Sequence, residues 1–325
     1  PGQEVLALLK PYPKLMPGVD GAARFTGNDV GLRGSNFPSE SDDVYKIVTI
    51  GGSTTEVLYL DDTEDWSYLL MESLNANDSD VSVWVANGGQ SGRNTVDHLE
   101  LMRILPVVND VEMLIFLIGI NDLQPVLSVG GGPTQEILVA NALDFRKQVL
   151  NGGRRVRPSR PYFKRTELFS LVRGASVRSL GKFSPTTVTG WLGVGPSGFI
   201  TEKRQQRAGA PTVGIPDLQT GLEEYGERIR AIASECQTRG VRCLFLTQPT
   251  IWRDDLSPED RDLLWFGWVK NEPQPTGYLS PGDLATAMDA FNWKLLSVCA
   301  NDSLECFDLA RLVAKDTSAF YDDAH

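Results

Sequence analysis

The sequence is poor in histidine and cysteine, and it has no long apolar run. Its 325 residues include only two histidines, His98 and His325, so a histidine-based mechanism has two candidates for its base. No stretch approaches the roughly 18 consecutive apolar residues that a membrane-spanning helix needs. The 31 basic residues are outnumbered by 42 acidic ones, and a net charge of −11 argues against nucleic-acid binding, which needs a basic face. The hydrophobic share of 41% is that of an ordinary globular chain.

The four cysteines form two pairs in the sequence, Cys236 with Cys243 and Cys299 with Cys306, each with six residues between the partners. Neither pair has the two-residue spacing of a zinc knuckle, and two histidines cannot complete such a site, so no metal site is expected. Four cysteines allow three disulfide pairings, and the alternative is four buried thiols in a reducing cytosol. The matched local spacing favours two local disulfides and therefore an extracytoplasmic protein.

Short apolar runs alternate with segments of helical periodicity along most of the chain. Strands are expected at 45–50, 81–86, 113–118 and 241–247, with a weaker one beginning at 305, and helical segments at 66–71, 96–105 and 218–234. This alternation predicts βαβ units and a parallel sheet. The run at 113–118 is nearly all apolar, which is typical of the buried centre of such a sheet.

Two regions depart from the alternating pattern. Residues 1–40 are rich in proline and glycine and are expected to form an extended arm before one α/β domain over 41–325. A basic, partly helical insertion is expected at about 130–215, because the segment from Arg146 to Arg207 carries 14 of the 31 basic residues. Its only acidic residues are Glu167 and Glu202. Such a segment can contact a membrane or another anionic surface, or it can simply present solvated helix faces.

Glycines and polar residues follow three of the predicted strands, where a doubly wound sheet binds its ligands. Gly51-Gly52-Ser53 follows the first strand, 87–92 follows the second and 119–122 follows the third. The glycines would let Ser53 stand exposed on a sharp turn, as a nucleophile does. At the end of the chain, Asp322 precedes His325 by three residues, so the chain has the parts of an acyl-transfer site. Each part alone could be a turn or a helix cap, and the apolar neighbours of His98 favour a structural role for it.

As a set, these segments resemble the SGNH hydrolase superfamily, also called GDSL-type esterases and lipases. The four blocks of that family are matched in order by Ile50-Gly51-Gly52-Ser53, Asn87-Gly88-Gly89-Gln90-Ser91-Gly92, Gly119-Ile120-Asn121-Asp122 and Asp322-Asp323-Ala324-His325. Upstream, 28–34 resembles the lead-in of bacterial secreted or membrane-anchored members. The resemblance implies a three-layer α/β/α sandwich with a central, mostly parallel five-stranded sheet of the flavodoxin-like type.

The resemblance also implies a role for each matched residue. Ser53 corresponds to the nucleophile, His325 to its base and Asp322 to the carboxylate that orients the imidazole. The oxyanion hole would consist of the backbone N–H groups of Ser53 and Gly92 and the side-chain amide of Asn121. Gly52 stands where the usual family motif has aspartate, which is a feature of the GGS-type branch. The implied chemistry is cleavage of a carboxylic ester through an acyl-enzyme, without a metal or an organic cofactor.

The substrate is the least determined part of the expectation. Trp265 and Trp268 could line an acyl or sugar pocket, or they could be ordinary core residues. Short-chain acyl or O-acetyl esters, on a small molecule, a lipid or an acylated glycan, are the expected substrates. The alternatives are an O-acetyltransferase that acts on a cell-surface polysaccharide and a non-catalytic binding module. The presence of Ser53, Asn121 and His325 argues against the binding module, because a decayed site usually loses at least one such residue.

Overall fold

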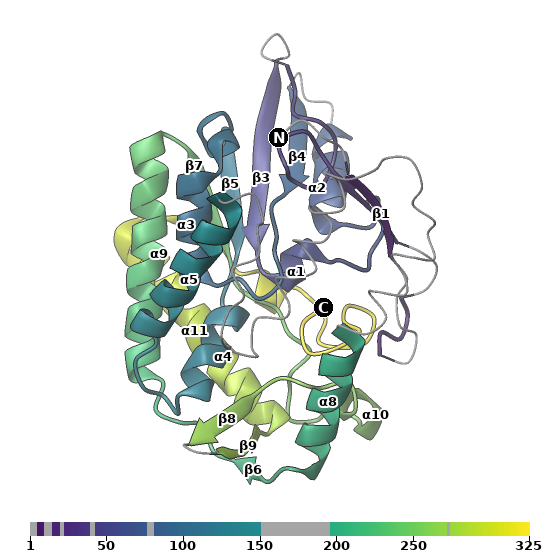
Figure 1. Ribbon diagram of the computed structural model, residues 1–325, viewed down its shortest axis with the longest axis vertical. Helices are drawn as coiled ribbons and strands as arrows, with labels where there is room; N and C mark the ends of the chain where they lie inside the picture. Colours follow the sequence, from purple (N-terminus) through teal and green to yellow (C-terminus); the bar gives the residue numbers. More distant parts are fainter. Residues whose placement is uncertain are drawn as a thin grey trace.

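The computed structural model describes residues 5–9, 15–19, 23–39, 43–76, 81–150, 196–271 and 274–325 (Figure 1). Most of the predicted basic insertion, from 151 to 195, lies outside the described residues, and so do parts of the predicted N-terminal arm.

A five-stranded sheet of parallel strands lies at the centre of the fold. Its spatial order is β10-β7-β5-β3-β4, and every neighbouring pair is parallel. Numbered along the chain this is the order 2-1-3-4-5, the flavodoxin-like arrangement of a doubly wound sheet. The predicted fold class is therefore confirmed. The strands are β3 (Val44–Gly51), β4 (Ser82–Asn87), β5 (Met113–Leu117), β7 (Arg242–Leu246) and β10 (Glu305–Phe307).

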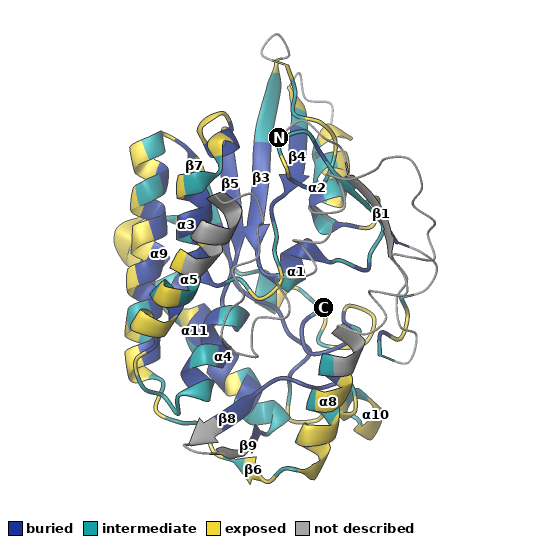
Figure 2. Ribbon diagram, in the orientation of Figure 1, coloured by how far each residue is buried: buried dark blue, intermediate teal, exposed yellow. Residues whose placement is uncertain are grey.

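Successive residues of the inner strands pack into two different hydrophobic clusters, as the two-residue period of a strand requires. Ile47 and Ile115 belong to a cluster that includes residues of helix α2 (Trp66–Asn75). Val48 and Phe116 belong to a larger cluster with α3 (Thr95–Ile104), α9 (Gln219–Arg239) and α11 (Pro281–Asp302). Both faces of the sheet are thus covered, and Figure 2 shows the buried strands between helices whose outer faces are exposed. The remaining helical segments are α1 (Ser53–Glu56), η1 (Pro106–Asn109), α4 (Ile120–Ser128), α5 (Gln135–Leu150), α8 (Pro196–Gly209), α10 (Pro258–Arg261) and η3 (Leu309–Arg311).

Two small sheets were not predicted. In the region predicted as an extended arm, β1 (Val5–Leu9) and β2 (Ala23–Gly27) pair antiparallel. At the opposite end of the molecule, β6 (Thr212–Val213), β9 (Gln274–Leu279) and β8 (Trp268–Asn271) form a three-stranded sheet (Figure 1). In the second of these sheets, β6 has only two residues and β9 contains Pro275 and Gly277, so neither gives a periodic apolar signal.

Both predicted disulfides are present. Cys236–Cys243 joins the end of α9 to β7, and Cys299–Cys306 joins the end of α11 to the edge strand β10, with Cα–Cα distances of 6.3 and 6.2 Å. Each bond therefore fixes a helix to the strand that follows it. Within the described part of the chain, no helix combines the length and the apolar character needed to cross a membrane.

Candidate active site

The candidate site lies where the strand order of the central sheet reverses. The chain passes from β3 outward to β4 and then crosses back to β5 on the other side of β3, so the switch point lies between β3 and β5. Ligands of open α/β sheets bind in the crevice outside the carboxyl ends of the strands at such a point. Ser53 follows β3 directly, and Asn121 lies in the first turn of α4, after β5.

Ser53 is the first residue of the short helix α1. Gly52 caps this turn: its carbonyl accepts hydrogen bonds from the backbone N–H groups of Thr55, at 3.2 Å, and Glu56, at 3.0 Å. The Ser53 side chain is therefore presented at the start of the turn, next to the positive end of its peptide dipoles. Ser53 is partly exposed, whereas Gly52 and Thr54 on either side of it are buried.

Asn121 packs directly against the serine turn. Its Nδ2 atom donates a hydrogen bond of 2.9 Å to the Arg93 carbonyl. A Cβ atom placed on Gly52 would overlap that same Nδ2 atom. A side chain at residue 52 would therefore force the Asn121 amide to move, because that amide occupies the space of a Cβ atom there.

The segment 87–92, called the glycine block below, is hydrogen-bonded to the end of β3 and then forms a turn. The backbone N–H groups of Gly88 and Gln90 donate to the carbonyls of Thr49, at 2.8 Å, and Gly51, at 3.0 Å. A β-turn follows, closed by a 3.2 Å bond from Arg93 N–H to the Gln90 carbonyl. Gly92 is the third residue of this turn and has a φ of 75°, which is the conformation that favours glycine at that position.

Asp322 and His325 form a hydrogen-bonded pair within one loop. His325 Nδ1 lies 2.8 and 3.0 Å from the two carboxylate oxygens of Asp322. The backbone N–H of His325 donates to the same carboxylate at 2.9 Å, and that of Ala324 at 3.1 Å. The three-residue spacing therefore lets one buried carboxylate hold both the backbone and the imidazole of His325.

A tryptophan completes the shell of donors around Asp322. Trp265 Nε1 donates to Asp322 Oδ2 at 3.0 Å, across 57 residues of sequence. Burial alone would raise the pKa of Asp322, but the neighbouring His325 and these hydrogen bonds outweigh burial and lower that pKa below its usual value. Asp322 is therefore an anion at neutral pH, as the partner of an imidazole base should be.

Asp323 faces away from His325. Its carboxylate accepts hydrogen bonds from Trp252 Nε1 at 2.8 Å and from the backbone N–H of Trp265 at 2.7 Å. Burial, and then the charge of Asp322, raise the pKa of Asp323 to about 6. Asp323 thus holds the segment that carries Trp265, and Asp322 is the carboxylate that contacts the histidine.

The C-terminal loop packs next to the serine turn. Tyr321 packs with Leu58 and Tyr59, which follow α1, and its ring stacks on the His325 ring with 5.9 Å between centroids. Figure 1 shows the C-terminus beside α1. Among the described contacts there is no hydrogen bond between the side chains of Ser53 and His325. Such bonds are often long before substrate binds and tighten in the catalytic complex.

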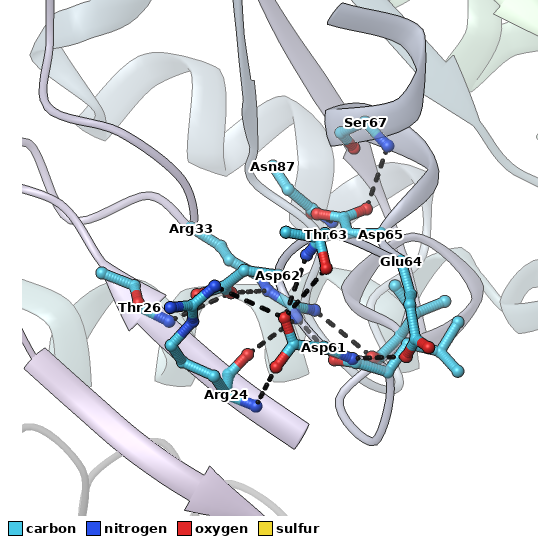
Figure 3. Close-up of polar contacts among 12 residues, drawn as sticks. Arg24, Thr26, Arg33, Asp61, Asp62, Thr63, Glu64, Asp65, Ser67 and Asn87 are labelled. Carbon is cyan, nitrogen blue, oxygen red and sulfur yellow. Dashed lines mark hydrogen bonds and ion pairs between the residues drawn. The ribbon is translucent and has the colours of Figure 1, made fainter. Parts of the chain in front are cut away.

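Arg33, in the lead-in segment 28–34, holds the end of α1 and the loop that follows it. This buried guanidinium donates to the carbonyls of Glu56 at 3.0 Å and Leu60 at 2.6 Å, and to the Asp62 carboxylate at 2.9 Å. Figure 3 shows Arg33 and Arg24 converging on the loop with Asp61 and Asp62. Arg33 therefore ties the N-terminal region to the chain that leaves α1.

His98 and Asp122 have structural surroundings. His98 is 2% exposed within α3, and burial, followed by the charge of Arg93, lowers its pKa to about 3, so it is a neutral core residue. Asp122, next to Asn121, is 1% exposed and forms a buried ion pair of 3.3 Å with Arg228. Neither side chain is placed to exchange protons with Ser53.

Trp265 and Trp268 make the contacts of core residues, which was one of the two expectations for them. Each is 7% exposed, and both rings pack edge-on against Phe199 of α8. Lys203 Nζ lies 4.3 Å from the centre of the Trp268 ring. The hydrogen bond from Trp265 to Asp322 gives this tryptophan a role in the site that no feature of the sequence indicates.

Two arginines of the predicted basic insertion are used inside the fold. Arg204 donates to the carbonyls of Leu263 and Leu15, both at 3.0 Å. Arg207 donates to the carbonyls of Phe266 at 2.6 Å and Leu279 at 2.8 Å. These two residues of α8 therefore hold the Trp265 segment. Within the described ranges, no group of three or more histidine, cysteine, aspartate or glutamate side chains could hold a metal ion.

Comparisons with known proteins give matches among solved structures only. No protein-family model matches the chain, and no curated protein sequence matches it. One similar structure is an acetyl xylan esterase, AlAXEase, at 11% identity over 82% of this chain and 78% of that chain, with a TM-score of 0.39. Another is the acetylxylan esterase Axe2 from Geobacillus stearothermophilus, at 12% identity and the same coverages, with a TM-score of 0.37. A third is TesA, at 13% identity over 80% and 76% of the two chains, with a TM-score of 0.35.

Proposed function

We propose that this protein is a serine ester hydrolase of the SGNH type. The observation that carries the proposal is the Asp322–His325 pair, with its 2.8 Å contact, anchored beside the turn that presents Ser53 and contacts Asn121. On this proposal Ser53 is the nucleophile, His325 the base and Asp322 the orienting carboxylate, with amide donors from Gly92 and Asn121. These are the groups that acyl transfer requires.

The mechanism uses His325 twice in each half of the reaction, first as a base and then as an acid. Because Nδ1 of His325 faces Asp322, Nε2 takes the Ser53 proton while Ser53 Oγ attacks the ester carbonyl. The same imidazolium then protonates the leaving alcohol, which leaves an acyl group on Ser53. In the second half, His325 takes a proton from water, the resulting hydroxide attacks the acyl carbonyl, and Ser53 recovers its proton.

The oxyanion is stabilised by three donors on this proposal. They are the backbone N–H groups of Ser53 and Gly92 and the Nδ2 group of Asn121, whose second hydrogen is held by the Arg93 carbonyl. A donor of this kind typically contributes about 2.7–4 kcal/mol to transition-state stabilisation. The Arg93 carbonyl holds the Asn121 amide, and β3 holds the glycine block, so such donors would need little reorganisation during the reaction.

The proposed substrates are short-chain acyl or O-acetyl esters, including those on carbohydrates. The side chains around the serine turn include the buried Glu56 and the half-buried Arg93 and Asn121, and a long alkyl chain would need an apolar lining instead. A panel of p-nitrophenyl esters from acetyl to palmitoyl, assayed with and without polysaccharide acceptors, tests this proposal. Preference for acetyl and butyryl esters without an acceptor supports it. Turnover that requires an added sugar would establish the alternative O-acetyltransferase, and no turnover of any ester would contradict both.

We also propose that the protein works outside the cytoplasm. Two disulfides and no free cysteine among the described residues support this location, because thiols stay reduced in the cytosol.

Replacing Gly52 with alanine tests the steric account of the oxyanion hole. The new Cβ atom displaces the Asn121 amide, so we expect kcat to fall by about 100-fold or more, the usual effect of losing one donor, while KM changes little. Gly214→Ala is the matched control, because a Cβ atom there meets nothing within 4 Å and the backbone is not left-handed. Steady-state kinetics and thermal melting of both variants make the comparison. Unchanged kcat in Gly52→Ala would show that Asn121 does not serve the reaction.

A further inference from the structure

A buried carboxylate of helix α1 accepts hydrogen bonds from the glycine block. Glu56 is 9% exposed and lies three residues after Ser53 in α1. Its Oε2 atom accepts a 2.9 Å hydrogen bond from the backbone N–H of Ser91 and a second, short one from the Ser91 hydroxyl. Ser91 immediately precedes Gly92, whose N–H group is one of the proposed oxyanion donors. The nucleophile turn and the oxyanion turn are thus connected through one side chain.

Polar and cationic groups surround the buried Glu56 carboxylate. Arg33 contacts the Glu56 backbone carbonyl, and Arg93 is the second cation whose charge acts on this carboxylate. Burial is the largest influence and raises the pKa of Glu56, while the Ser91 hydrogen bonds and the two arginines oppose that rise. A carboxylate is costly to bury without such partners, so this arrangement is maintained against a penalty.

The position of Ser91 determines where the Gly92 N–H group points. Ser91 and Gly92 are the two central residues of the turn closed by Arg93 and Gln90, and the Gly92 N–H belongs to the peptide bond between them. In a turn with a positive φ at its third residue, that central peptide is the one whose orientation distinguishes the turn types. Two hydrogen bonds from Ser91 to Glu56 therefore hold the second residue of the turn, and the Asn121 amide holds its last residue, Arg93.

We propose that Glu56 is a positioning residue of the oxyanion hole, which holds the Ser91–Gly92 peptide so that the Gly92 N–H faces the reacting carbonyl. This inference rests on the proposed serine esterase function. Glu56 itself touches neither Ser53 Oγ nor substrate; it acts through Ser91. Loss of its carboxylate should therefore weaken transition-state stabilisation while leaving substrate binding nearly unchanged.

A second glutamate of the same chain provides a matched control. Glu224 accepts hydrogen bonds from the backbone N–H of Thr134 at 2.9 Å and from its hydroxyl at 2.6 Å, the same double contact that Glu56 makes with Ser91. It lies on α9, away from the serine turn. Glu224 also accepts a 3.3 Å hydrogen bond from the Gln135 N–H and pairs with Arg228 at 3.7 Å, so Glu224→Ala removes at least as many polar contacts without touching the glycine block.

The experiment compares Glu56→Ala, Glu56→Gln and Glu224→Ala with the wild-type protein. We measure kcat and KM for p-nitrophenyl acetate, the rate of covalent labelling by a fluorophosphonate, and the melting temperature. Glu56→Ala should lower kcat and the labelling rate together by about 10- to 100-fold, less than the full loss of a donor, with KM within about twofold. Glu56→Gln, whose side-chain oxygen can still accept from Ser91, should recover most of kcat. Glu224→Ala should lose stability but keep kcat.

The results that overturn the inference differ from those that overturn the proposed function. A folded Glu56→Ala protein with wild-type kcat and labelling rate would show that Glu56 has no positioning role, although Ser53 remains the nucleophile. Equal losses of kcat in Glu56→Ala and Glu224→Ala would reduce the effect to general destabilisation, which also contradicts the inference. Failure of the wild-type protein to react with the fluorophosphonate would instead overturn the serine mechanism, and the inference with it.

Discussion

Replacing Ser53 with alanine should abolish ester turnover and leave the fold intact. Ser53 is partly exposed at the first position of α1, and its Oγ makes no hydrogen bond among the described residues that alanine would remove. Without a nucleophile the acyl-enzyme cannot form, so kcat should fall by about 10⁴- to 10⁶-fold, as in other serine hydrolases. The measurement is kcat/KM for p-nitrophenyl acetate alongside the circular dichroism melting curve.

Ser82→Ala is the control for this change. Ser82 lies at the exposed beginning of β4, distant in the fold from the carboxyl end of that strand, and its loss should alter neither activity nor stability. A folded Ser53→Ala protein that turns over esters like the wild type would eliminate Ser53 as the nucleophile.

Replacing His325 with alanine should be almost as damaging as replacing Ser53. The Asp322 contacts to Nδ1 and to the backbone N–H of His325 hold this ring as the base, and no other described side chain offers an imidazole beside the turn. We expect kcat to fall by about 10⁴-fold or more. His98→Ala should change mainly the melting temperature, because His98 is a neutral residue of the core. Inactive His98→Ala together with active His325→Ala would reverse the assignment.

The same assignment predicts the direction of the pH dependence. The pKa of Asp322 lies below its usual value, so this carboxylate stays ionised throughout the acidic range in which an imidazole, with an ordinary pKa of about 6.5, becomes protonated. A protonated His325 cannot accept the Ser53 proton. Hydrolysis should therefore fall as the pH drops through the pKa of His325 and stay high at mildly alkaline pH. A kcat/KM profile that rises toward acidic pH would contradict a histidine base.

The two neighbouring aspartates should separate in the same assay. Asp322→Ala should lose about 100-fold in activity, which is less than His325→Ala loses, because the imidazole remains but is no longer oriented. Asp323→Ala should lose least, since Asp323 contacts Trp252 and the Trp265 backbone and not the histidine.

The five strands of the central sheet were predictable because they are short apolar runs that end in glycine or polar residues. The run at 113–118 is β5, in which every residue is buried, and the weak signal at 305 is the edge strand β10. The signal at 305 is weak because β10 has only three residues, of which Glu305 and Phe307 are exposed. The disulfides followed from local spacing alone, since each joins a helix end to the next strand.

Other elements carry no such signal. The residues of β8 and β9 include Gly277 and Pro275, which lower strand propensity, and their pairing is decided by packing against the rest of the fold. Helix α11 does have a start signal in the sequence, Ser280 as its cap followed by Pro281. Its 22 residues include the buried Met288 and Phe291, which pack in the same cluster as the central strands.

The contacts of the candidate site also fall into those that the sequence anticipates and those that it does not. The Asp322–His325 contact spans three residues, so the sequence spacing anticipates it. The contacts that support the site join residues far apart in the chain: Trp265 with Asp322 across 57 residues, Ser91 with Glu56 across 35 and Arg33 with the Glu56 carbonyl across 23. No local pattern reports such contacts, because they depend on how loops from different strands meet at the switch point of the sheet.

Peptide mapping of a fluorophosphonate adduct tests the central claim most directly. The wild-type protein is incubated with the reagent, digested and analysed by mass spectrometry, with Ser53→Ala and His325→Ala treated in parallel. The account predicts a single modified residue, Ser53, with no adduct in Ser53→Ala and labelling slowed by orders of magnitude in His325→Ala. An adduct on any other serine, or undiminished labelling of the Ser53→Ala protein, would contradict it.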